Sequence, residues 1–393
     1  MLDQLLQKLE EKKERMIEIR RYLHQHPELS FKEEKTSQYI ADFYKDKNVI
    51  IRTNVGGYGV VVKIEGGLAG KTVALRADFD GLPITEEADV PFKSSNPGVM
   101  HACGHDGHTA YLMILAEALI EIKDQLRGNV VILHQPAEET PPGGAIAMIE
   151  DGCLEGVDSI FGIHLMSPSV TGEVSYRAGE MQAGRSYFKV KIQGKGGHGS
   201  MPHTSNDSIV AASHFVVAAQ TIVSRRINPF DMATVTIGSF DGKGSFNVIK
   251  DSVELEGDVR TMSSEVRAKV ETEFKRILAG LAQEFDITYD LIYSHDYPVL
   301  VNDKAMTELV VNGIKKAEIP EIKALVETTP MSGSEDFAYY LQKIPGSMFY
   351  VGAKPEDGPV YPHHHPKFVI NEDSLIIAAK AMAAVVAEYF GQK

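Results

Sequence analysis

Hydrophobic residues in the first half of the chain follow two periods, one typical of helices and one typical of strands. Apolar residues recur at helical spacing in three segments, 5–23, 33–45 and 106–122. Short apolar runs separated by Gly-rich turns predict strands at 49–53, 58–65 and 72–77. Two continuous apolar runs, typical of strands buried on both faces, predict further strands at 129–135 and 159–165. Strands that alternate with helices predict an α/β domain on a mixed or parallel sheet. Asp106 is expected to cap the helix that begins there.

The pattern changes near Gly179, where strands begin to alternate apolar and polar residues as half-exposed strands do. Strands are predicted at 187–193, 233–240, 252–261 and 287–293, and helices at 206–226 and 263–285. Ser263 is a good cap for the second helix. The order β-α-β-β-α-β is that of a ferredoxin-like α+β unit.

After Pro298 the α/β character returns. Helices are predicted at 304–316, 335–343 and 372–389, and strands at 323–327 and 348–351. The simplest organisation is a discontinuous α/β domain, residues 1–183 and 297–393, interrupted by a small α+β insertion at 184–296.

Composition excludes several classes of protein. The 393 residues carry a formal net charge of −14 without a basic run, so nucleic acid and anionic membranes are poor partners. The N-terminus lacks the apolar core of a signal peptide, and no segment has the uninterrupted apolar length of a membrane helix, so we expect a cytoplasmic protein. Cys103 and Cys153 are the two cysteines, too few for a disulfide scaffold.

The densest chemical signal is the segment Met100–His108, which reads MHACGHDGH. Thiolate and imidazole are good ligands for zinc-like cations, and Cys103 and His105 alternate in a loop, so both can face one centre. The N-terminus of the following helix should favour the thiolate form of Cys103. The alternative is a buried cysteine beside histidines that cap a helix.

Acidic and histidine residues also follow the predicted buried strands. Glu138 and Glu139 come directly after one strand, where one acid can bind metal while the other acts as a base. His164 ends another strand, and Asp78 and Asp80 end a third, where one carboxylate can orient a metal-bound histidine. Taken singly, each has an ordinary alternative: a solvated turn, a core histidine, or a turn that needs Asp.

Two further motifs lie later in the chain. The segment 362–366 contains three consecutive histidines, either a metal-ligand loop or an exposed tract. The Gly-rich segment 194–203 includes His198, but neither it nor 238–245 matches the phosphate-loop pattern, so a nucleotide site is not indicated.

Together these motifs resemble the M20 metallopeptidase and amidohydrolase family, and most closely its branch of N-acyl-amino-acid, hippurate and indole-acetyl-amino-acid hydrolases. The motifs occur in the family's order: HQHPELSF, LRADFDGLPI, MHACGHDGH, QPAEE, GIHL, GGHGSMPH, FNVI, GDVRT, GSEDF and HHHPKF. The resemblance implies a mixed-sheet, zinc-peptidase-like catalytic domain with an inserted ferredoxin-like domain that serves as lid and dimerisation surface.

The resemblance also implies a site with two divalent metal ions. The implied ligands are Cys103, which would touch both ions, and His105, Glu139, His164 and His364. His364 is chosen because the family ligand lies two residues before the proline, here Pro366, although His363 and His365 adjoin it.

Other implied residues serve catalysis and substrate binding. Glu138 matches the catalytic carboxylate, Asp80 the acid that supports the metal site, and His198 the oxyanion-stabilising histidine that reaches the other subunit. Substrate-binding positions are matched by Asn247 and Arg260 in the insertion and by Glu335, with Asp336, in a loop of the pocket wall.

The activity implied is metal-dependent hydrolysis of the linear amide bond of N-acyl amino acids. Zinc suits Cys103, while manganese, cobalt or nickel also fit, and the protein would be a homodimer or a tetramer. Rival functions are a dipeptidase or aminopeptidase, a deacetylase of an acylated diamino acid such as N-acetyl-diaminopimelate, and a metal-binding scaffold without turnover. Met166 stands where the branch often has an aromatic residue, so the acyl group is left open.

Overall fold

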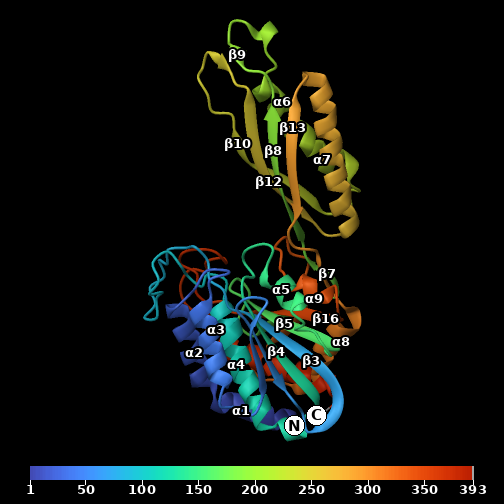
Figure 1. Cartoon of the computed structure of the whole chain (residues 1–393). Coiled ribbons are helices and arrows are strands. Elements are labelled where there is room, and N and C mark those ends of the chain that lie inside the picture. Colours follow the sequence, from blue (N-terminus) through green and yellow to red (C-terminus); the bar gives the residue numbers. More distant parts are fainter. Residues whose placement is uncertain (392–393) are drawn as a thin grey trace. The chain divides into compact units, whose positions relative to one another are not determined.

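The computed structural model, described for residues 1–391, divides into two compact units (Figure 1). The larger unit contains Met1–Gly179, Val301–Thr329 and the segment that begins at Asp336. The smaller unit contains Glu180–Leu300 and Pro330–Glu335. Each unit has a hydrophobic core of its own.

The larger unit is built on an eight-stranded mixed sheet. In spatial order its strands are β1 (Ile50–Val55), β2 (Gly59–Ile64), β4 (Arg127–Gln135), β3 (Leu68–Asp78), β5 (Ser159–Met166), β16 (Gly346–Gly352), β6 (Glu173–Tyr176) and β15 (Ala324–Glu327). The four central strands β4, β3, β5 and β16 run parallel to one another, whereas β2 and β6 on either side of them are antiparallel. Their continuous apolar runs are explained by burial on both faces. The predicted α/β class with a mixed sheet is confirmed.

Helices cover this sheet. They are α1 (Leu2–Glu11), α2 (Lys13–Gln25), α3 (Glu34–Tyr44), α4 (His105–Glu121), α5 (Gly144–Glu150), α8 (Lys304–Ala317), α9 (Ala338–Leu341) and α10 (Asp373–Tyr389), with a short 3-10 turn at Lys123–Gln125. Helix α4 is buried along nearly its whole length, since α2 and α10 pack against it.

Two sequence predictions about these helices need correction. The single helix expected over 5–23 is two helices, because the backbone at Lys12 leaves the helical conformation; α1 then packs mainly on α10 and α2 on α4. Asp106 does not cap α4. Gly104, with φ of 90°, is the N-cap residue, and Asp106 lies inside the first turn with its carboxylate bound to Arg20 and His24.

The smaller unit has a four-stranded antiparallel sheet and two long helices. Its elements in chain order are β8 (Gly184–Gln193), α6 (Ser208–Thr221), β10 (Ala233–Asp241), β12 (Ser252–Thr261), α7 (Ser264–Phe285) and β13 (Thr288–His295). The spatial order β10-β12-β8-β13 is what a ferredoxin-like β-α-β-β-α-β unit produces. Phe188, Phe215 and Phe274 fill its core.

Shorter elements complete both units. Helix α6 continues into a π-helical turn, Ile222–Arg226, so the helix expected over 206–226 begins two residues late. β9 (Gly197–His198) pairs with β11 (Val248–Ile249), and a 3-10 turn covers Pro202–Thr204. β7 (Gly179–Gln182) and β14 (Leu300–Asn302) lie where the chain passes between the units.

The N-cap of α7 offers a test of the smaller unit. Ser263 Oγ accepts the Val266 amide at 3.1 Å, as its sequence position predicts. We expect Ser263→Ala to destabilise α7 by about 1 kcal/mol, measured as faster native-state hydrogen exchange in α7. Ser264→Ala is the matched control because Ser264 is exposed and makes no cap. Equal exchange in the two variants would contradict the role of the cap.

Candidate metal centre and active site

Strand topology gathers the chemical groups at one edge of the large sheet. Asp78 ends β3 and lies opposite Gln135 at the end of β4, because these strands are parallel. His164 lies near the end of β5, the parallel neighbour of β3 on its other side. The carboxyl ends of parallel strands meet at a common edge, where ligands bind in open α/β sheets.

A first group of three ligand atoms centres on Cys103. The metal-binding atoms of Cys103, His105 and His164 all lie within 4.8 Å of one another. Cys103 Sγ is 3.5 Å from His164 Nε2. Gly104, left-handed at φ 90°, turns the chain between Cys103 and His105 so that both side chains face this point.

A second group shares the same cysteine. Ligand atoms of Cys103, Glu139 and His364 also lie within 4.8 Å of one another, and His364 Nε2 is 3.1 Å from Glu139 Oε1. The structure therefore brings together all five residues for which the sequence predicted a metal-ligand role. They form two overlapping groups with Cys103 in common.

The donor set fits two divalent cations. His105 Nε2 and Glu139 Oε1 are buried and make no well-aligned hydrogen bond among the described residues, although they lie 3.8 Å apart. Such buried polar atoms without a partner are costly unless a ligand satisfies them. Nitrogen, sulfur and carboxylate oxygen together are the donors that zinc and related cations take.

Electrostatics at the cluster also favour a cation. Burial lowers the pKa of His105, but the charges of Asp78, Asp80 and Glu139 outweigh it and raise the value to about 10. Burial, and then Glu139 and Glu138, raise the pKa of the Cys103 thiol well above its usual range. This shift is opposite to the one expected from the N-terminus of α4, because burial and the neighbouring carboxylates favour the thiol form of Cys103.

Asp80 orients the cluster. Its carboxylate lies 3.1 Å from His105 Nδ1, which leaves Nε2 directed at the cation position. Its other oxygen accepts hydrogen bonds from Ser30 Oγ at 2.7 Å and from the Glu139 amide at 3.0 Å. His164 is fixed in the same manner, since its Nδ1 donates to the Leu165 carbonyl at 2.9 Å. Outer hydrogen bonds of this kind select the tautomer of a metal-binding histidine.

The other two histidines of the Met100–His108 segment, His101 and His108, make contacts outside the groups around Cys103. His108 Nδ1 is 2.6 Å from Asp78 Oδ1, and its Nε2 accepts the Leu165 amide at 2.9 Å, so both ring nitrogens are used. His101 is buried beside His24, and burial first lowers its pKa to about 4. Neither belongs to the groups around Cys103.

The three consecutive histidines, His363, His364 and His365, make different contacts. His364, left-handed at φ 66°, approaches Glu139. His363 Nδ1 lies 3.6 Å from Cys103 Sγ, but its Nε2 faces the Ser167 amide at 3.4 Å. His365 stacks on Tyr361 and accepts the Lys367 amide, away from the cluster.

Glu138 lies in the same cluster. It is buried, and its carboxylate falls within 4.8 Å of ligand atoms of His105 and Glu139. The preceding residue, Ala137, is left-handed at φ 55°, a conformation that costs a non-glycine residue about 1–2 kcal/mol. This turn directs both consecutive acids to the cluster, although adjacent side chains of a regular strand would diverge.

A buried polar network that sequence reasoning missed anchors the metal-binding loop. Arg20 Nε donates to Asp106 Oδ2 at 2.7 Å, and His24 bridges that oxygen and Glu86 Oε1 at 2.8 and 3.1 Å. Burial lowers the pKa of His24, but the hydrogen bonds to Asp106 and Glu86 raise it overall. The available signal was an Arg and a His four residues apart on one helix, which place both side chains on one face.

Asp336 has a similar anchoring role in the larger unit. It is fully buried and accepts hydrogen bonds from Arg76, Gln135 and the Ala145 amide. Its carboxylate is therefore committed to the protein, and the place of its loop in a pocket wall stays a prediction. Glu335, the preceding residue, is buried in the last segment of the smaller unit.

The predicted residues of the smaller unit lie at two ends of its sheet. Arg260, near the end of β12, is opposite Arg185 at the start of β8; it donates to Asp258 at 2.8 Å and to Ser334 at 3.1 Å. His198 is exposed on β9, beyond the other end of β8 at Gln193. At about 3.3 Å per residue along β8, these ends are roughly 26 Å apart.

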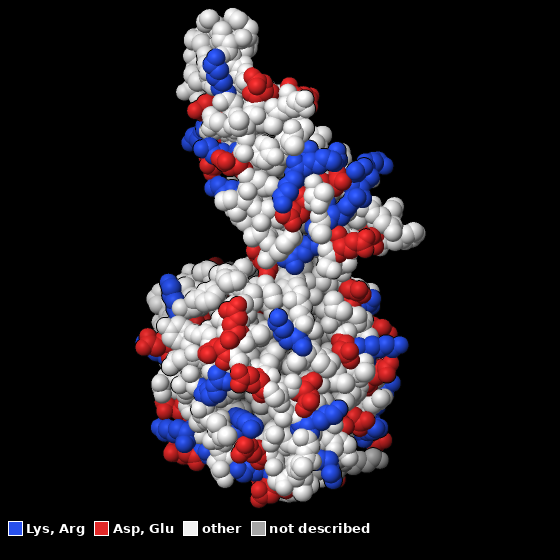
Figure 2. Space-filling model, turned by 45° about the vertical axis from the view of Figure 1, so that its right-hand side comes forward, with Lys and Arg blue, Asp and Glu red and all other residues white. Residues whose placement is uncertain are grey.

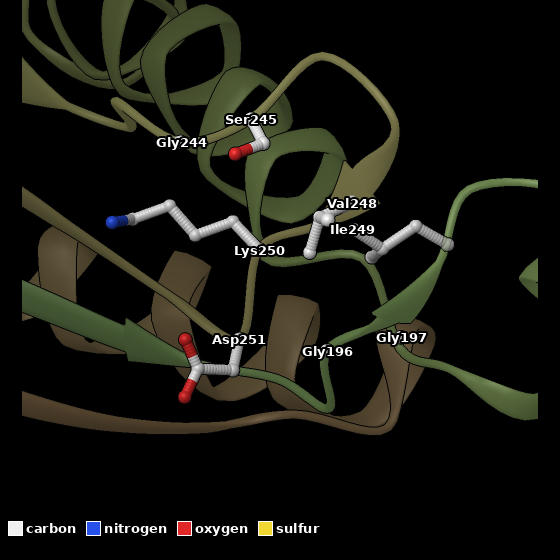
Figure 3. Close-up of a pocket in the computed structure, with 8 residues that line it drawn as sticks. All are labelled: Gly196, Gly197, Gly244, Ser245, Val248, Ile249, Lys250 and Asp251. Carbon is white, nitrogen blue, oxygen red and sulfur yellow. The ribbon is translucent and has the colours of Figure 1, made fainter.

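Asn247 belongs to the His198 end, where its carbonyl accepts the Gly199 amide at 2.8 Å. A hollow of about 440 Å³ lies beside it (Figure 3). Its lining combines small, branched apolar and charged residues: Gly196, Gly197, Gly244, Ser245, Val248, Ile249, Lys250 and Asp251. The structure thus groups His198 with Asn247 and separates both from Arg260.

Comparison with known proteins identifies the family. The sequence profile of Peptidase family M20/M25/M40 matches residues 74–388. The chain belongs to this family. It is similar to the Bacillus subtilis protein named amidohydrolase YhaA, with 47% identity over 96% of this chain and 95% of that protein.

Other M20 relatives carry different activities in their names. N-acetyl-L-cysteine deacetylase of Bacillus subtilis is 42% identical over 93% of this chain and 85% of its own. Thermostable carboxypeptidase 2 of Saccharolobus solfataricus is 38% identical over 99% of both chains. The YXEP protein of Bacillus subtilis, described as a dinuclear metal binding peptidase of the M20 family, superimposes with a TM-score of 0.84 at 31% identity, covering 98% of this chain and 100% of its own.

The shared position of Cys103 gives a test of this M20 site. Because it belongs to both ligand groups, Cys103→Ala should reduce bound zinc to well below one ion per subunit, measured by elemental mass spectrometry after dialysis. His364→Ala should retain about one ion, since it removes a ligand from one group only. Cys153→Ala is the control, a buried cysteine outside the cluster. Full loading of Cys103→Ala would exclude the shared-ligand arrangement.

Proposed function

We propose that this chain is a metal-dependent amidohydrolase that cleaves the amide bond of N-acyl amino acids to a carboxylic acid and a free amino acid. The observation that carries the proposal is the buried Glu138 beside two ligand groups that share Cys103. A metal-binding scaffold has no need of a second, adjacent carboxylate at the cluster. The similarity to a relative named N-acetyl-L-cysteine deacetylase supports an acylated amino acid as the substrate class.

Two divalent cations, zinc in our proposal, would polarise the scissile carbonyl and acidify a water molecule when bound by Cys103, His105, Glu139, His164 and His364. Glu138 accepts the proton of the attacking water. It then returns this proton to the departing nitrogen, because an amine does not leave as an anion. Asp80 keeps His105 in the orientation that the site requires.

His198 is suited to stabilise the negative charge that develops on the carbonyl oxygen. Its Nδ1 accepts the Ser200 amide at 3.1 Å, so in the neutral ring Nε2 carries the proton. His198 is exposed, and Nε2–H is thus available as a donor to an oxyanion. Arg260 would bind the substrate carboxylate, with Asn247 and Glu335 completing the substrate contacts.

The separation of His198 from Arg260 supports a dimer as the active form. Arg260 lies beside the start of β8 and His198 lies on β9, beyond the other end of β8. These ends of β8 are roughly 26 Å apart, which exceeds the length of a small N-acyl amino acid. If both act on the same substrate molecule, one of them comes from a second subunit. We assign that role to His198, reaching the metal cluster of a partner in a homodimer.

The surface agrees with a small uncharged or anionic substrate rather than a polyanion. Figure 2 shows Lys and Arg intermixed with Asp and Glu over the visible face of the larger unit, without a basic patch. Among residues 1–391, no helix is long and apolar enough to cross a membrane.

The second candidate function is a peptidase on the same site. The similarity to a relative named thermostable carboxypeptidase 2, at 38% identity over 99% of the chain, favours it. A carboxypeptidase and an amino-acid deacylase both recognise a terminal carboxylate and cut the amide beside it. They differ in the acyl side of that amide, which is a peptidyl group for a carboxypeptidase and a simple carboxylic acyl group for a deacylase.

A substrate panel tests the function. We expect the zinc-loaded protein to release amine from N-acetyl and N-benzoyl amino acids, and we expect Glu138→Ala to lower turnover by at least about 10²-fold while keeping its metal. Amine release is followed with a fluorogenic reagent. Cleavage of dipeptides or longer peptides alone would move the assignment to peptidase, and no cleavage with metal bound would refute both.

Mixing two inactive variants tests the role of a partner subunit. His198→Ala and Glu138→Ala homodimers should each be nearly inactive. Subunit exchange between them should restore up to about a quarter of wild-type turnover, because a mixed dimer holds one site with both residues intact. Turnover is compared before and after exchange, with each variant mixed with itself as control. No recovery in verified mixed dimers would place His198 in the site of its own chain.

A further inference from the structure

Glu33 occupies the N-cap position of α3 but does not cap that helix. Its side chain makes no hydrogen bond to the first turn. Glu28 does so instead, since its Oε2 accepts the Thr36 amide at 2.8 Å and the Thr36 hydroxyl at 2.9 Å. Glutamate is also not among the residues favoured at N-caps. Capping of α3 therefore does not explain why a glutamate occupies position 33.

The Glu33 carboxyl reaches instead to the turn that carries Glu138. Glu33 Oε1 accepts the amide of Ala137 at 2.8 Å. Ala137 is the left-handed residue, φ 55°, directly before Glu138. Two residues far apart in the sequence are thus joined at the peptide that leads into the proposed general base.

Burial of Glu33 is unfavourable by itself. The residue is 0% exposed, and its Oε2 makes no hydrogen bond among the described residues. Burial, and then the charge of Asp80, raise the pKa of Glu33 to about 8, so the neutral acid predominates at pH 7. A buried carboxyl with one hydrogen-bonded oxygen costs stability, and strained backbone persists only where its surroundings hold it.

Other contacts hold the rest of this turn. The Ala137 carbonyl accepts the Gly144 amide at 3.0 Å, and the Glu139 amide donates to Asp80 at 3.0 Å. The metal-binding Glu139 therefore keeps its own anchor without Glu33. The Ala137 amide, one residue before Glu138, depends on the Glu33 carboxyl.

We propose that Glu33 is a positioning residue that holds the left-handed Ala137 peptide and thereby sets the direction in which Glu138 projects into the metal cluster. The inference rests on the proposed function, because it is there that Glu138 receives its proton-transfer role. It assigns to Glu33 an effect on turnover rather than on metal or substrate binding.

Two substitutions of similar shape separate this role from simple packing. Glu33→Gln is neutral and retains a side-chain oxygen for the Ala137 amide, so kcat should stay within about threefold of wild type. Glu33→Met retains the length but removes the acceptor. It should lower kcat by about 10- to 100-fold, the effect of a small misplacement of a catalytic group. KM and the metal content of Glu33→Met should stay close to wild type.

A second-site change tests the mechanism. Glycine adopts positive φ without strain, so Ala137→Gly should reduce the dependence of the turn on Glu33. We expect Glu33→Met/Ala137→Gly to recover a substantial part of the turnover lost in Glu33→Met. Equal kcat in Gln and Met variants, loss of metal in Glu33→Met, or a double variant no better than Glu33→Met would each overturn the proposal.

Hydrogen exchange separates failure of this inference from failure of the proposed function. The Ala137 amide should be protected in wild type and Glu33→Gln, and should exchange about tenfold faster in Glu33→Met. This measurement needs no substrate. If the wild-type protein cleaves no amide, the proposed function fails, but hydrogen exchange still shows whether Glu33 holds the Ala137 amide. Equal protection of this amide in all three proteins would refute the Glu33 proposal.

Discussion

Buried polar atoms that lack a hydrogen-bond partner are unfavourable, and this constraint governs the edge of the large sheet. Cys103, His105, Glu139, His164 and His364 direct donor atoms at two neighbouring points, while the Glu139 amide donates to Asp80 and His164 Nδ1 donates to the Leu165 carbonyl. Among residues 1–391, no well-aligned hydrogen bond satisfies His105 Nε2 or Glu139 Oε1. Divalent cations would turn these unfavourable contacts into bonds, so the metal site and the stability of the loops around it are expected to be linked.

The parallel strands make this arrangement rigid. β3, β4 and β5 are buried on both faces, and their ends carry Asp78, the Glu138–Glu139 turn and His164. Outside this inner set, polar groups are tied in pairs: Asp80 to His105, Asp78 to His108, and Asp336 to Arg76 and Gln135. A site held in this way keeps its geometry between turnovers, which electrostatic catalysis requires.

Sequence patterns located most elements and the ligand-bearing segments because periodicity and donor type are local properties. The burial of β3 to β5 and the cap at Ser263 follow from neighbouring residues. The full ligand set around Cys103 was implied by the resemblance to the M20 family, because its members are far apart in the sequence. The break at Lys12 accompanies the packing of α1 on α10 and of α2 on α4. Asp106 is bound by Arg20 and His24 of α2. Both are long-range contacts, which the periodicity of hydrophobic residues does not predict. Glu33 is similar: its sequence position indicates a helix start, and its partner Ala137 lies 104 residues away.

The four-stranded sheet of the smaller unit begins and ends, in chain order, on neighbouring strands. β8 is its first strand and β13 its last, and Ser186 is directly opposite His295 in their antiparallel register. The two ends of this β-α-β-β-α-β segment are therefore about 5 Å apart across the ladder. An insertion with adjacent ends closes only a short gap in its host, at little cost in chain entropy. Such a module can be lengthened, exchanged or lost during evolution without disturbing the sheet that carries the metal ligands.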